Sequence, residues 1–209
     1  MSDTLTAILV VAGSYLLGSI PFGFVLPRIF RKEDIRKVGS GNVGATNVFR
    51  VYGRWLGVPV ALLDVLKGFT PAYVGLMLGS DWLAVIAGAA AMLGHARPIW
   101  LRFSKGGKMV ATAGGVSLAL APLAAILCAV LWLVVFLLTK YASLASLAAA
   151  VALPIATFAF GASWPIVGFS TAASVSVAIL HRHNVGRLLA GNEPRFKRAP
   201  KPATGRPVR

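Results

Sequence analysis

The sequence predicts an all-α integral membrane protein built as a bundle of about seven transmembrane helices. Of its 209 residues, 57% are hydrophobic and only 13% are charged, whereas soluble domains carry about 25% charged residues. The apolar residues fall into long runs, and almost all Lys and Arg residues lie between these runs. Both observations indicate helices that cross a bilayer and are joined by basic loops.

Seven apolar segments are candidate spans, because a helix needs about 20 apolar residues to cross a bilayer core of about 30 Å. The run from 109 to 139 is too long for one span, and Gly114, Gly115 and Pro122 offer breaks in it. Its first piece is short, so a count of five or six spans is the alternative. The segments cover residues 4–27, 57–78, 82–101, 109–120, 122–139, 143–160 and 164–181.

The charges set the expected orientation. With seven spans, every cluster of Lys and Arg falls on one membrane side, which the positive-inside rule makes cytoplasmic. The opposite ends carry Asp3 and Asp81. The N-terminus is therefore expected outside and the C-terminus in the cytoplasm. Residues 1–190 are expected to form one transmembrane domain, and residues 191–209, rich in Pro and Arg, a disordered basic cytoplasmic tail.

Composition also excludes several classes of site. A net charge of +15 would suit nucleic-acid binding only if the basic residues shared a soluble face with aromatic side chains, and here they follow apolar runs. The single cysteine, Cys128, leaves no intrachain disulfide and no cysteine metal site. No carboxylates or histidines have metal-ligand spacing, so we expect no metal and no cofactor.

One cation lies inside a span. Lys67 is in the second segment, and Asp64 precedes it by three positions, on the same helix face. An unpaired charge at that depth is costly, so we expect the two to form a structural ion pair toward the bundle interior. Direct contact of the pair with substrate is the alternative.

Residues 39–47, GSGNVGATN, match the spacing of a dinucleotide-binding turn. That turn follows a strand in a βαβ unit, whereas a basic juxtamembrane stretch precedes this one, which disfavours a dinucleotide site. Backbone N–H groups of a glycine-rich loop can still hold an anion. An anion site is favoured over a plain flexible turn, with donors from Gly39, Ser40, Gly41, Asn42, Gly44, Thr46, Asn47 and Arg50.

A second polar segment contains Lys105-Gly-Gly-Lys108, which places two cations around Gly106 and Gly107 just before an expected helix. A helix N-terminus favours anions through its dipole, so this loop is a second anion site. His95 ends the preceding span. For His95, a structural role in orienting the loop is favoured over substrate binding.

A third polar segment follows the last span. His181 and Asn184 are three residues apart and share a face if the helix continues. Glu193 is expected to pair with an arginine. Three such segments on one membrane face indicate a composite site for a phosphate-bearing ligand.

Together the three segments resemble bacterial acylphosphate-dependent glycerol-3-phosphate acyltransferases of the PlsY type. GSGNVGATN with Arg50, then GH…KGGK-x-VAT, then H-x-x-N-x-x-RL…E are similar to the family's three motifs in order and spacing, and the resemblance covers nearly the whole chain, KYASLAS included. It implies a seven-helix enzyme of the bacterial inner membrane with a cytoplasmic active site. The implied reaction moves a fatty acyl group from acyl phosphate to the 1-hydroxyl of glycerol 3-phosphate. The products are 1-acyl-glycerol 3-phosphate and phosphate, in the first step of phospholipid synthesis.

The resemblance also implies roles by position. Catalytic roles are expected at Ser40, Arg50, His181 and Asn184. The resemblance implies phosphate binding at Gly106, Gly107, Lys108 and Ser143 and a structural role for Glu193. From the residues themselves, substrate or phosphate binding is expected at the other first-loop residues and at Lys105, and structural roles at Asp64, Lys67 and His95.

Two positions depart from the family's pattern. Met109 stands where the family usually has glycine, directly after the second-motif lysine, and Leu180 stands where an arginine usually precedes the histidine. The backbone geometry after Lys108 is therefore open. Arg182 is a candidate source of the missing charge.

The chemistry follows from the implied donor. Acyl phosphate is already activated, so direct attack by the glycerol hydroxyl is expected, with His181 or a substrate phosphate oxygen as the base. The H-x-x-x-x-D pattern expected of acyl-CoA-using glycerolipid acyltransferases does not occur. Expected partners are the two substrates, membrane lipid and an enzyme that supplies acyl phosphate, and no nucleic acid. The rival function is a membrane transporter of a small phosphorylated anion, but the outer ends offer few polar groups for its access path.

Overall fold

The computed structural model describes residues 3–196, and every regular element in that range is helical, which confirms the all-α class. Two short 3-10 helices, η1 (Ile35–Lys37) and η2 (Ile99–Leu101), lie in loops. The α-helices are α1 (Asp3–Gly18), α2 (Phe22–Arg31), α3 (Ala45–Tyr52), α4 (Arg54–Met77), α5 (Asp81–Ala96), α6 (Val110–Leu120), α7 (Pro122–Thr139), α8 (Ala142–Ala159), α9 (Trp164–Leu180) and α10 (Arg182–Leu189).

Four helical segments of the described chain are long and apolar enough to cross a membrane: α4, α5 with η2, α7 and α8. The bent pairs α1 with α2 and α9 with α10 also qualify when each pair is counted as one span, which raises the number to six. A seventh span would depend on α6, an apolar helix of only 11 residues. The count of seven stays a prediction, and the segment 109–120, its weakest part, is the one that decides it.

The first predicted span, 4–27, is two helices. α1 ends at Gly18, and α2 begins at Phe22 after a bend of 42°. Pro21 occupies the N-cap of α2, and proline disfavours helical geometry in the residue before it, which explains the break. α2 then carries Arg28 and Arg31 in its last turn, as expected for a helix whose end lies near lipid head groups.

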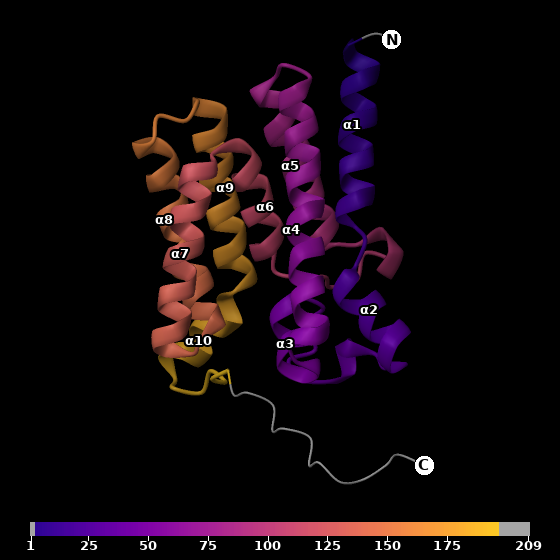
Figure 1. The fold of residues 1–209 in the computed structure, drawn as a ribbon, viewed down its shortest axis with the longest axis vertical. Helices are drawn as coiled ribbons and strands as arrows, with labels where there is room; N and C mark the ends of the chain where they lie inside the picture. Colours follow the sequence, from indigo (N-terminus) through magenta and orange to yellow (C-terminus); the bar gives the residue numbers. More distant parts are fainter. Residues whose placement is uncertain (1–2, 197–209) are drawn as a thin grey trace.

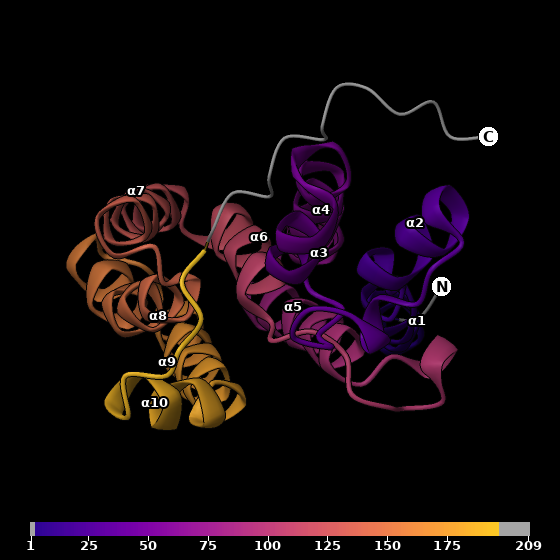
Figure 2. The ribbon, with the colours of Figure 1, turned by 90° about the horizontal axis from the view of Figure 1, so that it is seen from below.

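The helices form two groups, which Figure 2 shows from below. In one group α4 packs against α1, α5 and α6, and in the other α8 packs against both α7 and α9. Contacts of α6 with α7 and of α5 with α9 join the groups. The short helices α3 and α10 lie at the end of the bundle opposite the start of α1, together with α2 (Figure 1).

Small residues allow α4 and α6 to approach closely at the centre. A Cβ on Gly68 of α4 would lie 2.1 Å from the carbonyl oxygen of Thr112, and one on Gly115 of α6 would lie 1.9 Å from that of Val65. Such small residues let membrane helices pack backbone to backbone. The contact fixes the position of α6 and therefore of its N-terminus, where the second glycine loop ends.

Residues 191–196, which the sequence assigns to a tail, pack against the bundle. The Phe196 ring lies 5.4 Å from the rings of both Phe49 in α3 and Phe136 in α7, measured between centroids. Its backbone N–H donates to the carbonyl of Lys140 at 2.8 Å. This segment therefore joins the two helix groups. The rest of the expected tail, residues 197–209, lies outside the described residues.

Candidate active site

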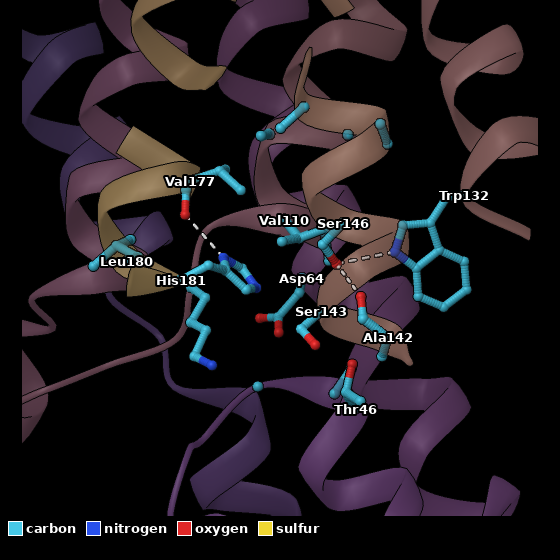
Figure 3. A pocket seen from close by; sticks show the side chains of 18 of the residues that line it. Thr46, Asp64, Val110, Trp132, Ala142, Ser143, Ser146, Val177, Leu180 and His181 are labelled. Atoms are coloured by element: carbon cyan, nitrogen blue, oxygen red, sulfur yellow. Dashed lines mark hydrogen bonds between the residues drawn. The ribbon is translucent and has the colours of Figure 1, made fainter. Parts of the chain in front are cut away.

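The three polar segments meet at one cavity of about 990 Å³. Ser40 of the first loop, Lys108 of the second and His181 of the third all line it. Figure 3 shows the side chains of His181, Asp64, Ser143 and Thr46 around a common space, although they come from the bend after α9, from α4, from α8 and from α3. The folded chain thus brings distant polar segments to a single place.

Most residues singled out from the sequence border this space. Four of them, all described by the structure, are not part of its lining: Gly39, Lys67, Gly106 and Gly107. Those that line it are Ser40, Gly41, Asn42, Gly44, Thr46, Asn47, Arg50, Asp64, His95, Lys105, Lys108, Ser143, His181, Asn184 and Glu193.

The first loop is held in shape by its own side chains. Asn47 Oδ1 accepts the N–H of Ser40 at 2.9 Å, and Asn47 Nδ2 donates to the carbonyls of Val38 and Asn42 at 3.2 and 2.9 Å. Asn42 Oδ1 accepts the N–H of Gly44 at 2.8 Å. The amides of Ser40 and Gly44 are thus used within the loop, and the buried Asn47 organises it.

Free amides occur one step further along, at the start of α3. Within the described chain, the N–H groups of Ala45 and Thr46 have no hydrogen-bond partner, and both residues line the cavity. No side chain caps this helix end. The first turn of a helix carries a partial positive charge on such groups, so α3 presents an anion-binding end to the cavity.

The start of α6 presents a second such end. Val110 and Ala111 line the cavity, and their N–H groups likewise lack a partner among residues 3–196. Met109, the N-cap, has φ of 67°, a left-handed conformation that costs a residue with a side chain about 1–2 kcal/mol. Met109 thus adopts the backbone geometry that suits the family's glycine, and its side chain is buried in the core.

The glycines of the second loop serve close packing. The N–H groups of Gly106 and Gly107 donate to the carbonyls of Ala96 and His95 at 2.9 and 3.0 Å. These two amides are therefore used within the fold, and the phosphate-binding role of the two glycines stays a prediction. Lys105 and Lys108, on either side of them, do line the cavity.

Glu193 connects the third motif with α8. Its Oε1 accepts hydrogen bonds from Ser143 Oγ at 2.6 Å and Asn184 Nδ2 at 2.7 Å, and its Oε2 accepts one from Arg187 Nε at 2.7 Å. Burial acts to raise the pKa of Glu193, but these hydrogen bonds outweigh it and hold the pKa below its usual range. Glu193 is thus a fixed carboxylate, and Arg187 is the arginine partner expected from the sequence.

Two half-buried cations face the cavity. Burial lowers the pKa of Lys108 to about 8, although nearby Glu193 opposes the shift. Burial also lowers the pKa of Arg50 from its ordinary value, and Arg50 Nε has no hydrogen-bond partner among the described residues. Guanidinium and ammonium groups in this state are suited to charge-assisted hydrogen bonds with phosphate oxygens.

His181 lies at the 59° bend between α9 and α10. Its Nδ1 is 2.8 Å from the carbonyl oxygen of Val177 (Figure 3). Since that oxygen can only accept, the neutral ring carries its proton on Nδ1 and a lone pair on Nε2. His181 is buried and lines the cavity, so its free nitrogen is in position to accept a proton or orient a hydroxyl.

The other half of the cavity is apolar and was not foreseen from the motifs. Its walls come from α6, α7, α8 and α9, and include Leu118, Ile126, Trp132 and Leu153. Trp132 is fixed by a 3.0 Å hydrogen bond from its Nε1 to Ser146 Oγ (Figure 3). A signal for this wall exists in the sequence of α8, where small residues repeat with helical spacing: Ala142, Ser146, Ala149 and Ala150.

The ion pair inside α4 is present. Lys67 Nζ lies 2.8 Å from Asp64 Oδ1 and donates to the carbonyl of Ile20 at 2.8 Å. Both side chains are buried. Asp64 lines the cavity whereas Lys67 does not, so the pair connects the cavity wall to the break between α1 and α2.

Sequence comparisons identify similar proteins along almost the whole chain. Residues 8–191 match the family model described as glycerol-3-phosphate acyltransferase. A glycerol-3-phosphate acyltransferase of Synechococcus sp. (strain JA-3-3Ab) is 45% identical over 196 residues, which cover 94% of this chain and 96% of the relative. One from Mesorhizobium japonicum is 47% identical over 186 residues, which cover 89% and 94%.

Solved structures agree with the sequence comparisons. The glycerol 3-phosphate form of PlsY (YgiH), described as an integral membrane glycerol 3-phosphate acyltransferase, is similar with a TM-score of 0.88 and 41% identity, covering 92% of this chain and 96% of that one. Its lysophosphatidic acid form gives 0.85 and 40% over the same shares. The resemblance drawn from the three motifs is therefore confirmed.

Proposed function

Because the chain belongs to the glycerol-3-phosphate acyltransferase family, we propose that it transfers a fatty acyl group from acyl phosphate to the 1-hydroxyl of glycerol 3-phosphate. We place the enzyme in a bacterial inner membrane with its polar loops in the cytoplasm, in keeping with the distribution of Lys and Arg. The observation that carries the proposal is the two-sided cavity. Its cationic half suits phosphate groups, and its apolar half, among α6 to α9, suits a fatty acyl chain.

The polar half offers two ends for two phosphate groups. The N-terminus of α6 and Lys108 lie next to the apolar half of the cavity, because α6 lines both the polar and the apolar half. The phosphate of acyl phosphate fits there, with its chain between the helices. The N-terminus of α3, with Ser40 and Arg50, fits the phosphate of glycerol 3-phosphate. This arrangement would place the glycerol hydroxyl between the two.

In the proposed reaction the 1-hydroxyl oxygen of glycerol 3-phosphate attacks the acyl carbonyl carbon. A carbon–oxygen ester bond forms, and the bond between the acyl carbon and the bridging oxygen breaks. The phosphate leaves with the bonding electron pair. The hydroxyl proton passes to His181 Nε2 or to a phosphate oxygen, and Lys108 and Arg50 offset the negative charge.

The identity of the acyl donor tests the proposed reaction. Purified protein in lipid would receive glycerol 3-phosphate with acyl phosphate, with acyl-CoA or with no donor. We expect 1-acyl-glycerol 3-phosphate and free phosphate in equal amounts with acyl phosphate alone. Transfer from acyl-CoA instead would refute the donor. Movement of intact glycerol 3-phosphate across sealed vesicles, without acyl transfer, would favour the transporter.

A further inference from the structure

His95 is a buried histidine at the end of α5 that the proposed reaction does not use. Its Nδ1 lies 3.6 Å from Asp64 Oδ1, and the same carboxylate oxygen is 2.8 Å from Lys67 Nζ. All three residues are 5% exposed or less. They form a row of contacts that begins at the carbonyl of Ile20, where Lys67 is anchored, and ends at the His95 ring.

The far edge of this ring supports the second glycine loop. A Cβ on Gly107 would lie 2.0 Å from His95 Nε2 and 2.4 Å from its Cε1. The ring therefore rests against the Cα of Gly107, with no space for a side chain between them. The Gly107 N–H donates to the carbonyl of His95 itself. Lys108 is the next residue, so the position of the His95 ring determines the position of the Lys108 backbone.

Both nitrogens of His95 are directed at protein groups. Nδ1 faces Asp64, and Nε2 is covered by Gly107. A general base needs a nitrogen within hydrogen-bond reach of the substrate proton, which this arrangement does not provide. His181, with Nδ1 bound to a carbonyl and Nε2 uncommitted, differs in this respect. The contacts of His95 therefore point to support of the loop.

We propose that His95, held in place by the Asp64–Lys67 ion pair, is a positioning residue. It fixes the distance of the Lys105–Lys108 loop from α5, so that the Lys108 ammonium meets a substrate phosphate. The inference deepens the proposed function and rests on it through the role of Lys108. Removing the ring would let the loop sink toward α5. A displacement of about 1 Å in a catalytic group can cost about a hundredfold in rate.

The test is a compensation between two substitutions that fill the same space. His95→Ala removes the ring, and Gly107→Ala adds a methyl group where the ring lies. Each alone is expected to raise KM for acyl phosphate at least about tenfold, with a smaller change in kcat, because a displaced charge weakens phosphate binding. In the double variant the methyl group occupies space left by the ring. Its kcat/KM should exceed that of Gly107→Ala at least about tenfold.

Gly106 supplies the matched control. A Cβ there would lie 2.1 Å from the carbonyl oxygen of His95 and 2.9 Å from that of Ala96, which are backbone atoms that His95→Ala leaves in place. Gly106→Ala should therefore stay impaired in both backgrounds. Gly168→Ala, on α9 where the added Cβ meets open space, should match the unaltered protein. Recovery of the Gly106 pair equal to that of the Gly107 pair would overturn the inference, because it would indicate general loosening.

Two further measurements keep the result decisive. Thermal unfolding and gel filtration show whether His95→Ala folds. If it does not, His95→Gln takes its place, because glutamine retains a planar polar group of similar reach. The KM of His95→Gln should lie within about threefold of the KM of the unaltered protein, and a larger increase would contradict the positioning role. Glycerol 3-phosphate affinity, measured by calorimetry without a donor, should change by less than about threefold in these variants, because its phosphate is placed at the start of α3 and not at Lys108. Absence of acyl-phosphate-dependent transfer in the unaltered protein would instead refute the proposed function. A double variant no better than Gly107→Ala in an otherwise active protein would refute the inference alone.

Discussion

Lys108 Nζ donates a hydrogen bond to Asn184 Oδ1 at 2.5 Å, although the two residues are 76 positions apart in sequence. Asn184 in turn donates to Glu193, which also binds Ser143 and Arg187. One polar network thus links the loop before α6 with α8 and α10. Because the network fixes the cation without neutralising it directly, the Lys108 ammonium keeps its charge for a ligand.

The pH dependence of acyl transfer should report Lys108. With a pKa of about 8, the side chain is charged below that pH and neutral above it, so its attraction for phosphate is lost as the pH rises. The profile of kcat/KM for acyl phosphate, which reflects the free enzyme, should fall above about pH 8. Lys108→Arg should move this fall to higher pH, since arginine stays protonated. An unchanged alkaline limb in that variant would exclude Lys108 as its source.

Arg50 and His181 should be needed for turnover and not for folding. Arg50→Ala removes a half-buried cation whose Nε is buried without a partner among the described residues, and His181→Ala removes the candidate base. Each should lower kcat/KM by about 10²–10³-fold while the protein still inserts in membranes and unfolds cooperatively. Arg54→Ala, at an exposed position outside the cavity, is the control and should be active. Near-normal activity of both site variants would refute the assignment.

Glu193 should contribute to stability as well as to activity. Glu193→Gln removes the charge that accepts three hydrogen bonds, and bonds to charged groups are worth about 1.5–3 kcal/mol each. Arg187 is partly exposed, so we expect a total loss of about 2 kcal/mol, read from denaturant unfolding in detergent. Glu33→Gln, which alters an exposed hydrogen bond with Tyr52, should change stability by less than about 0.5 kcal/mol. Equal effects of the two substitutions would contradict the network.

Filling the apolar half should shorten the preferred acyl chain. Ala150→Phe places a ring in the cavity wall formed by α8. Val151→Phe adds the same ring at a residue that is 63% exposed and does not line the cavity. Each methylene excluded from burial costs about 0.8 kcal/mol, or about fourfold in kcat/KM. Competition between acyl phosphates of different length should therefore favour shorter chains in Ala150→Phe only. The same shift in both variants would place the chain elsewhere.

The elements that could be predicted are those with strong local signals. The span 122–139 coincides with α7 because Pro122 begins an unbroken apolar run and Lys140 ends it in a left-handed conformation. The sequence does not predict α3, because eight mixed residues carry little intrinsic helicity and packing against α4 stabilises them. The bend at Pro21 also divided a segment that looks continuous in hydropathy.

The candidate site divides in the same way. Charged, amide and glycine residues are distinctive between apolar runs. Ser40, Lys108 and His181 can therefore be identified as candidate site residues from the sequence, although the sequence does not show the cavity that they share. Spacing does not tell which partner a backbone amide will have, and the sequence gives no sign that the N–H groups of Gly106 and Gly107 donate to carbonyls of α5. The apolar wall was missed because its residues look like any lipid-facing or packed helix face until the neighbouring helices are placed.

The most direct test of the account follows one oxygen atom. Acyl phosphate labelled with oxygen-18 in the bridge between the acyl carbon and phosphorus would be given to the purified protein in lipid with glycerol 3-phosphate. Attack at the acyl carbon predicts one labelled phosphate for each unlabelled 1-acyl-glycerol 3-phosphate. Label retained in the lipid product, or phosphate released without that product, would contradict direct acyl transfer in this cavity.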